Sequence, residues 1–168
     1  LAGLDVGWRI RKGKGLKSAV ADRICELGRF GQKTGAGYFR YEKGDRTPIP
    51  DPEVEKIILE VAKEMGIKRR AVSDDEILAR LLYPMVNEGA KILEEKIAIR
   101  ASDIDVIWVY GYGWPVYRGG PMFWADQVGL KTIRERMLEF RHATGDELWT
   151  PAPLLDRLAT AGQGFVEA

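Results

Sequence analysis

Apolar residues recur every three to four positions along most of the chain, which is the spacing of one face of an amphipathic helix. The clearest case covers residues 54–65. Asp51 and Pro52, just before it, provide an N-cap and a favourable first helical residue, and Gly66 provides a stop. The pattern therefore predicts a helix over this segment, with its apolar side buried.

A longer helix is predicted from the capping-box sequence at 73–76 to Leu93. Pro84 lies inside this run, so we expect a kink near Leu81. Shorter helices are predicted to begin at Ser102, Pro121, Leu130 and Thr150. Only residues 38–41 have a sequence that is compatible with an extended strand. The predicted fold class is therefore all-α, with helices packed on helices.

Two parts of the chain resemble each other, which indicates an internal repeat. Residues 1–4 and 127–130 both place a Gly-Leu pair before a basic amphipathic helix. Residues 27–32 match 158–163 at the end of a short helix. The second copy is preceded by residues 73–126, for which the first copy has no counterpart, so we expect a first repeat that lacks roughly fifty residues. The expected organisation is the second half of the first repeat at 1–50, a connecting helix and linker at 51–72, and the second repeat at 73–168.

A truncated first repeat would leave an apolar face without its usual cover. We expect this exposed face around four residues, Leu4, Val6, Ile24 and Leu27. Another copy of the chain, or residues 73–93 of the same chain, would then pack across it.

The composition narrows the classes of protein that the chain can represent. Hydrophobic residues make up 45% and charged residues 30% of the 168 residues, as in an ordinary globular domain. The 26 Lys and Arg residues are balanced by 25 Asp and Glu residues, which argues against nucleic-acid binding. Cys25 and His142 are each the only residue of their type, which excludes an internal disulfide and a zinc site of several Cys or His ligands. The longest apolar stretch, 106–117, is broken by glycines and a proline, so we expect no membrane span.

Two glycine-rich segments raise the question of nucleotide binding. Residues 111–121 contain several glycines, but the segment before them is predicted to be helical, whereas a dinucleotide fingerprint follows a strand. Lys33 and Thr34 precede the glycines at 35–37, which reverses the order found in a phosphate-binding loop. We therefore predict turns at both places and no cofactor-binding residue.

The other polar candidates are interpreted as structural, so we predict no catalytic and no metal-binding residue, and the substrate-binding residues stay unknown. Asp103 and Asp105 do not share a helix face, which favours capping over paired-acid catalysis. Asn87, beside Glu88 within the long predicted helix, is expected to make a helix–helix hydrogen bond. His142 has no acid or nucleophile in a recognisable motif around it.

Two basic runs are candidates for anion contacts. The run at 68–70 follows a predicted helix end, where cations complement the helix dipole, and we interpret it as solvated. The run at 9–14 supports equally a solvated helix end and a contact to the phosphates of a nucleotide-bearing substrate. Binding of DNA through 9–17 is disfavoured by the near-zero net charge.

Several motifs together resemble a known family. Residues 28–41, GRFGQKTGAGYFRY, resemble the signature that ends the first C-terminal repeat of the 3-hydroxyacyl-CoA dehydrogenases, and 1–7 is similar to the segment before it. Residues 80–88, 103–105 and 111–121 resemble the second repeat, as in the multifunctional fatty-acid β-oxidation enzymes, such as the α subunit of the fatty acid oxidation complex. All motifs keep their order along the chain.

The resemblance implies an NAD-dependent oxidation of a 3-hydroxyacyl-CoA to the 3-ketoacyl-CoA in a parent enzyme. In that family a Rossmann NAD domain precedes two helical repeats and carries a His base, its orienting Glu and a Ser. An Asn within an Asn-Arg-Leu sequence begins the first repeat. The position that matches this Asn in the second repeat is Ala79, so the second repeat is expected to be catalytically silent. The chain itself is expected to hold no Rossmann domain and to bind no NAD.

The chain is thus interpreted as a C-terminal fragment that shapes the acyl side of the substrate cleft, supports domain packing and dimerisation, and is inactive alone. Its expected partners are the Rossmann domain, a hydratase/isomerase domain and the 3-hydroxyacyl-CoA of the parent enzyme, with a homodimer left open. The expected location is the cytoplasm in a bacterium, or the peroxisome or mitochondrion in a eukaryote. The alternative is a stand-alone helical protein-interaction module without dehydrogenase activity.

Overall fold

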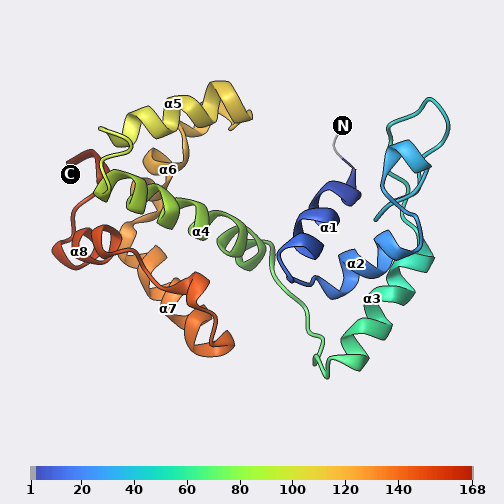
Figure 1. Cartoon of the computed structure of the whole chain (residues 1–168). Coiled ribbons are helices and arrows are strands. Elements are labelled where there is room, and N and C mark those ends of the chain that lie inside the picture. The colour runs from blue at the N-terminus through green and yellow to red at the C-terminus, as the bar shows by residue number, and fades with distance from the viewer. Residues whose placement is uncertain (1–2, 168) are drawn as a thin grey trace. The chain divides into compact units, whose positions relative to one another are not determined.

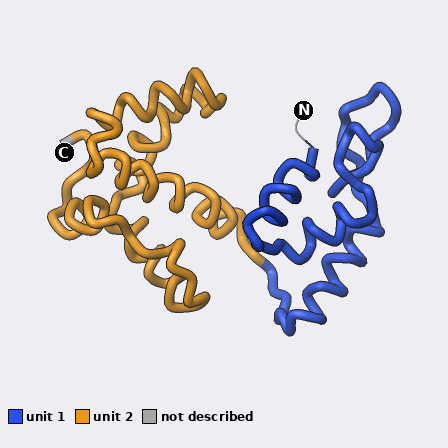
Figure 2. The backbone as a smooth tube through the Cα atoms, viewed as in Figure 1, with its two compact units in different colours: residues 1–71 blue, residues 72–168 orange. Residues whose placement is uncertain are grey.

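Helices account for all regular secondary structure in the part of the chain that the computed structural model describes, residues 3–167. Eight α-helices and four short 3₁₀ helices follow one another in this part (Figure 1). The chain divides into two units, residues 1–71 and 72–168, which Figure 2 colours separately. The predicted all-α class is therefore confirmed. The division into a truncated first repeat, a linker and a second repeat stays a prediction.

Unit 1 contains three α-helices, α1 (Leu4–Gly13), α2 (Ala19–Glu26) and α3 (Pro52–Glu64). Asp51 caps α3 by accepting a hydrogen bond from the Glu53 amide at 3.1 Å, as the sequence predicts. Helix α2 packs against both α1 and α3. The first two residues of the expected repeat motif at 1–4 lie outside the described residues.

The core of unit 1 corrects part of the expectation of an exposed apolar face. Ile24 is fully buried and packs with three residues of α3, Val54, Ile57 and Val61, while Leu4 lies partly buried against the same cluster. Val6 and Leu27 are exposed. Helix α3, which the sequence indicates as a connecting helix, packs within unit 1 and covers the part of the expected face around Ile24 and Leu4, while the part at Val6 and Leu27 is exposed as expected.

A long loop joins α2 to α3 and contains one 3₁₀ turn, η1 (Gln32–Thr34). The expected strand at 38–41 does not form within the described residues. Instead, isolated bridges pair Arg40 with Ala36 and with Ile49. A strand needs a neighbouring strand along its length, and this loop supplies a partner only at single positions.

Unit 2 contains five α-helices. They are α4 (Asp74–Glu94), α5 (Ala101–Tyr112), α6 (Pro121–Val128), α7 (Leu130–Thr144) and α8 (Pro153–Ala161). Ser73 caps α4 by accepting from the Glu76 amide at 3.2 Å, and α4 runs through Pro84 as a single helix. The helix expected from Thr150 begins instead at Pro153, and the 3₁₀ turn η3 (Glu147–Trp149) precedes it.

The core of unit 2 lies among α4, α6, α7 and α8, with α5 packed on α6. Its largest fully buried side chains include Met122, Ile133, Met137 and Leu155. Gly89 of α4 allows a close approach of α6, since a Cβ built there would lie 2.5 Å from the Met122 sulfur. No helix among residues 3–167 is both long and apolar enough to cross a bilayer.

Candidate functional site

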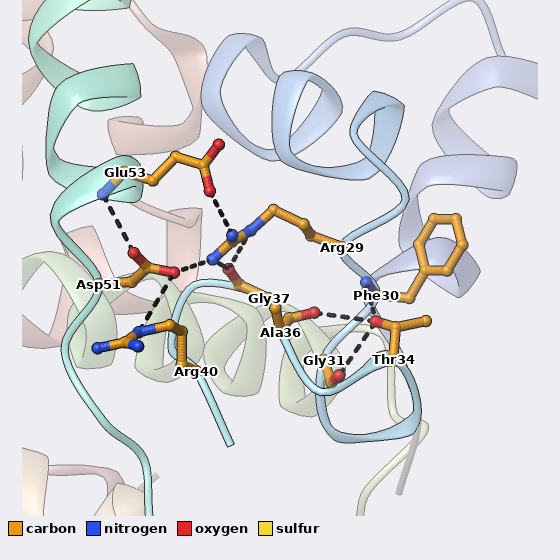
Figure 3. Close-up of polar contacts among 9 residues, drawn as sticks. All are labelled: Arg29, Phe30, Gly31, Thr34, Ala36, Gly37, Arg40, Asp51 and Glu53. Carbon is orange, nitrogen blue, oxygen red and sulfur yellow. Dashed lines mark hydrogen bonds and ion pairs between the residues drawn. The ribbon is translucent and has the colours of Figure 1, made fainter. Parts of the chain in front are cut away.

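The polar centre of unit 1 is the guanidinium of Arg29, whose side chain is only 12% exposed (Figure 3). It donates to the Gly37 carbonyl oxygen at 3.1 and 3.2 Å and to the Glu53 carboxylate at 2.7 Å. It also forms an ion pair with Asp51, the residue that caps α3. Arg29 therefore fastens the loop after α2 to the beginning of α3.

The loop itself is held by local hydrogen bonds (Figure 3). The Thr34 hydroxyl accepts from the Phe30 amide at 2.8 Å and lies within hydrogen-bond distance of the carbonyl oxygens of Gly31 and Ala36. Gly35 adopts a left-handed conformation with φ of 72°. The predicted turn at 33–37 is thus confirmed, and this part of the motif resembling the dehydrogenases is a loop held by its own hydrogen bonds.

A second buried carboxylate neutralises the basic residues beside this loop. Asp5 forms an ion pair with Lys33 and another with Arg9 at 3.4 Å. Within the basic run at 9–14, Arg11 also pairs with Asp22, at 2.6 Å. Three of the cations considered for phosphate contacts are therefore already paired within unit 1.

The Arg29–Asp51 pair predicts a pH dependence of the stability of unit 1. The hydrogen bond from Arg29 lowers the pKa of Asp51 below its usual range. The ionised pair therefore stabilises the folded state above the ordinary pKa of an Asp, and this stabilisation is lost as the pH falls through the lowered native pKa. We expect Arg29→Met to lower the free energy of unfolding of unit 1 at pH 7 and to lose most of this effect in acid.

Urea unfolding at several pH values, followed through hydrogen exchange of α3, measures this effect. Arg46→Met is the matched control, because Arg46 is an exposed residue of the same loop. A difference between Arg29→Met and the parent chain that stays constant from pH 7 into acid would contradict the role of the ion pair.

In unit 2, Asp103 and Asp105 cap two different helices. Asp103 accepts from the Arg100 amide at 3.1 Å and pairs with the Arg100 guanidinium at 2.7 Å, at the beginning of α5. The buried Asp105 accepts from the amides of Met122 at 2.7 Å and Phe123 at 3.1 Å, at the beginning of α6. The predicted capping roles are confirmed, although the sequence did not identify α6 as the partner of Asp105.

The environment of Asp105 affects its ionisation in two opposing ways. Burial raises the pKa of Asp105, while the two amide hydrogen bonds act in the opposite direction. Gly120 approaches so closely that a Cβ built on it would lie 2.3 Å from the Asp105 Cβ. Each oxygen of the carboxylate therefore accepts one backbone hydrogen bond from the beginning of α6, and Gly120 packs closely against the side chain.

Asn87 is buried and joins α4 to the segment before α8. Its amide nitrogen donates to the Thr150 carbonyl oxygen at 2.9 Å, and its side-chain oxygen accepts from the Ala152 amide at 2.6 Å. The expected helix–helix hydrogen bond is thus wrong in its partner, because both bonds go to loop backbone. Glu88 is exposed and pairs with Lys91 at 3.0 Å.

The remaining candidates of unit 2 lie apart from one another, on different elements. Ala79 is 5% exposed and belongs to the hydrophobic core. His142 is exposed on the last turn of α7. Gly113 ends α5 and Gly119 ends a 3₁₀ turn, both in the left-handed conformation, as the predicted turns require. No group of three or more His, Cys, Asp or Glu among residues 3–167 could hold a metal ion.

Sequence reasoning did not single out the Arg29 ion pairs or the Asp105 cap of α6. Asp51 carried a signal, because its place before Pro52 identified it as a helix cap. Nothing near Arg29 indicated that it would pair with a residue 22 positions away. Polar contacts between residues that are close together in the sequence were therefore predictable, and contacts between residues far apart in the sequence were not.

Comparisons with known proteins agree with this architecture. The model of the C-terminal domain of 3-hydroxyacyl-CoA dehydrogenase matches residues 77–164. The peroxisomal bifunctional enzyme of Danio rerio is 42% identical over 96% of this chain and 25% of its own length. The peroxisomal fatty acid β-oxidation multifunctional protein of Oryza sativa is 38% identical over 86% of this chain and 20% of its own length.

A solved structure has a similar fold. The dehydrogenase part of multifunctional enzyme 1 from C. elegans matches with a TM-score of 0.71 and 30% identity, covering 92% of this chain and 36% of that one. The chain spans about a quarter of the length of the first curated relatives that it matches. Because the family model covers more than half of the 168 residues, the chain belongs to the 3-hydroxyacyl-CoA dehydrogenase C-terminal domain family.

Proposed function

We propose that the chain is the C-terminal helical part of an NAD-dependent 3-hydroxyacyl-CoA dehydrogenase of fatty-acid β-oxidation. The parent enzyme would oxidise a 3-hydroxyacyl-CoA to the 3-ketoacyl-CoA. Support comes from the family match at 77–164 and from relatives named as bifunctional or multifunctional β-oxidation enzymes. The hydride chemistry would belong to the remainder of the polypeptide, since relatives are about four times as long as the matched part.

The observation that carries this proposal is that the buried polar side chains form hydrogen bonds or ion pairs within their own unit. Asp51 and Asp105 cap helices, Asp5 pairs with Lys33, and Asn87 bonds to backbone. Glu76, which is also buried, pairs with Arg80 at 2.9 Å. A general base needs a lone pair that faces substrate, and these groups face partners in their own unit. Their arrangement supports a role in shape and packing.

The glycines of this chain do not fit a dinucleotide. The glycine-rich segment begins within the last turn of helix α5 rather than after a strand, and Gly113 ends that helix. The N-terminus of α6 is already occupied by the Asp105 carboxylate, which takes the place that a phosphate would need. We therefore assign NAD to a Rossmann domain in the remainder of the enzyme and derive no step of the reaction within this chain.

The partners follow from the same proposal. The chain would pack against the Rossmann domain and a hydratase/isomerase domain, border the acyl side of the substrate cleft and contribute to a homodimer. The location that the relatives favour is the peroxisome, because several of them are named as peroxisomal enzymes. This supports the eukaryotic alternative.

An activity measurement tests the proposed function. We expect the purified 168-residue chain to show neither NAD binding in calorimetry nor NADH formation with a 3-hydroxyacyl-CoA, because its buried polar groups are already engaged. The complete polypeptide encoded by the gene is expected to show both. Turnover by the chain alone, or a complete polypeptide that never reduces NAD with any chain length of substrate, would contradict the proposal.

A further inference from the structure

The segment between α3 and α4 (Figure 1) presents a serine hydroxyl to solvent. Residues 67–73 have no regular secondary structure, and every residue from 66 to 75 is exposed. Ser73, the last residue before α4, has an extended backbone with φ of −73° and ψ of 157°. Its hydroxyl oxygen accepts a hydrogen bond from the Glu76 amide at 3.2 Å. An enzyme can therefore reach this hydroxyl group and bind the backbone before it without unfolding a helix.

The charges on the two sides of Ser73 have opposite signs. Lys68, Arg69 and Arg70 precede it, so an arginine stands three residues before the serine. Residues 74–76, which follow it, are all acidic. Protein kinases distinguish their substrates by such charge patterns, and carboxylates of a kinase bind the guanidinium group of an arginine at this spacing. The proposed function uses neither group of charges.

The backbone favours recognition from the basic side. The segment before Ser73 is non-helical, whereas Asp74 already belongs to α4. Glu76 is buried and pairs with Arg80 at 2.9 Å. A kinase that recognises acidic residues after the serine would have to unwind the first turn of α4 and break this ion pair. A kinase that recognises the arginine needs only the segment that is already open.

Two threonines share the arginine spacing but not the conformation. Thr144 follows Arg141 by three residues, and Thr160 follows Arg157 by three residues. Both threonines lie in helices, where their hydroxyl groups donate to backbone carbonyl oxygens at 2.8 and 2.7 Å. Both arginines also form ion pairs within unit 2. Among residues 3–167, Ser73 alone combines the spacing with an exposed, non-helical approach.

We propose that Ser73 is the phosphoryl acceptor of a serine kinase that recognises an arginine three residues before its target. In this reaction Oγ of Ser73 attacks the terminal phosphorus of a nucleoside triphosphate and forms a phosphate ester bond. The bond between that phosphorus and its bridging oxygen breaks, and the nucleoside diphosphate leaves. A carboxylate base of the kinase accepts the hydroxyl proton.

Phosphorylation changes the charge of the segment. Residues 68–76 contain three basic and three acidic side chains, so their formal charges cancel. The phosphate adds a charge of about −1.5 to −2 at the N-terminus of α4. There its oxygens replace the serine hydroxyl as acceptors of the Glu76 amide. The inference goes beyond the proposed function and does not depend on it, because a kinase reads only this segment.

Phosphorylation in vitro, followed by peptide mass spectrometry, tests the site. The folded 168-residue chain is incubated with ATP, Mg²⁺ and an arginine-directed serine kinase. We expect Ser73 to be phosphorylated at least about tenfold faster than Thr144 or Thr160, because an acceptor inside a helix must first be released by local unfolding. An acid-directed kinase is used in parallel, and each rate is divided by the rate of the same kinase on its standard peptide. The normalised rate at Ser73 is expected to be higher for the arginine-directed kinase.

Two variants separate recognition from folding. Arg70→Gln is expected to lower kcat/KM of the arginine-directed kinase about tenfold, because a charge-assisted hydrogen bond is lost. Arg46→Gln is the matched control at another exposed arginine and is expected to leave kcat/KM unchanged. Ser73→Asn removes the acceptor but keeps a residue that caps helices, so phosphorylation at 68–76 is expected to stop while the melting temperature stays close to that of the parent chain.

Three results would overturn the proposal. They are phosphorylation of Thr144 or Thr160 as fast as that of Ser73, an equal kcat/KM for Arg70→Gln and the parent chain, and a higher normalised rate for the acid-directed kinase. The last result would assign recognition to residues 74–76 instead. None of these measurements involves NAD, so their outcome leaves the proposed function untouched.

Discussion

Gly120→Ala is expected to lower the free energy of unfolding of unit 2 by about 2–4 kcal/mol. Gly120 has φ of 103° and ψ of 166°, a conformation that is essentially restricted to glycine. An added Cβ would also lie 2.3 Å from the Cβ of Asp105 and 2.4 Å from its carboxyl oxygen Oδ1. The substitution would therefore strain the backbone and displace the cap of α6 together.

Urea unfolding followed by tryptophan fluorescence measures this loss, because four of the five tryptophans lie in unit 2. Gly145→Ala is the matched control. Gly145 also has a positive φ, of 69°, but a Cβ there would meet no atom within 4 Å, so we expect a loss of only about 1 kcal/mol. Equal losses for the two variants would mean that the approach of Gly120 to Asp105 is unimportant.

Asn87→Ala is expected to cost about 2–4 kcal/mol, because it leaves the Ala152 amide and the Thr150 carbonyl group without their partner inside unit 2. Glu88→Ala, at the adjacent exposed position, is expected to change the stability by less than about 0.5 kcal/mol. Calorimetric melting of the two variants gives the comparison directly.

Asn87→Asp separates the two hydrogen bonds of Asn87. The carboxylate would still accept from the Ala152 amide, but its second oxygen would face the Thr150 carbonyl oxygen and repel it. Repulsion and burial would raise the native pKa of the new carboxyl group, so the variant should gain stability relative to the parent chain as the pH falls. A difference that does not change with pH would show that Thr150 is not the group that Asn87 contacts.

The sequence predicted the helices best where their ends carry local signals. Asp51 and Ser73 cap α3 and α4 as expected, and Gly113 ends α5. Each signal acts within a few residues, so periodicity and capping rules are enough to recognise it. The beginning of α8 was misplaced by three residues, because a proline occurs at both positions 151 and 153 and either could begin a helix.

The contacts of the polar centres could not be predicted in the same way. Asp105 reaches an amide 17 residues away, and Asn87 reaches one 65 residues away. Such pairs depend on how the helices pack. The type of a residue and its place near a helix end do not indicate which distant residue it will contact. The expectation that the chain holds no catalytic residue stays a prediction. For the second repeat it came from the resemblance to the dehydrogenases, in which Ala79 matches the position of the family Asn, and Ala79 lies in the hydrophobic core.

The segment between α3 and α4 is a site where proteases can cut the chain. Residues 66–75 are exposed throughout and include a basic cluster at 68–70. Cellular proteases with a preference for Lys or Arg would find an accessible substrate here, since extended, solvated backbone fits a protease cleft. A single cut would fall outside both hydrophobic clusters, so degradation would begin by releasing two bodies that each keep their own core.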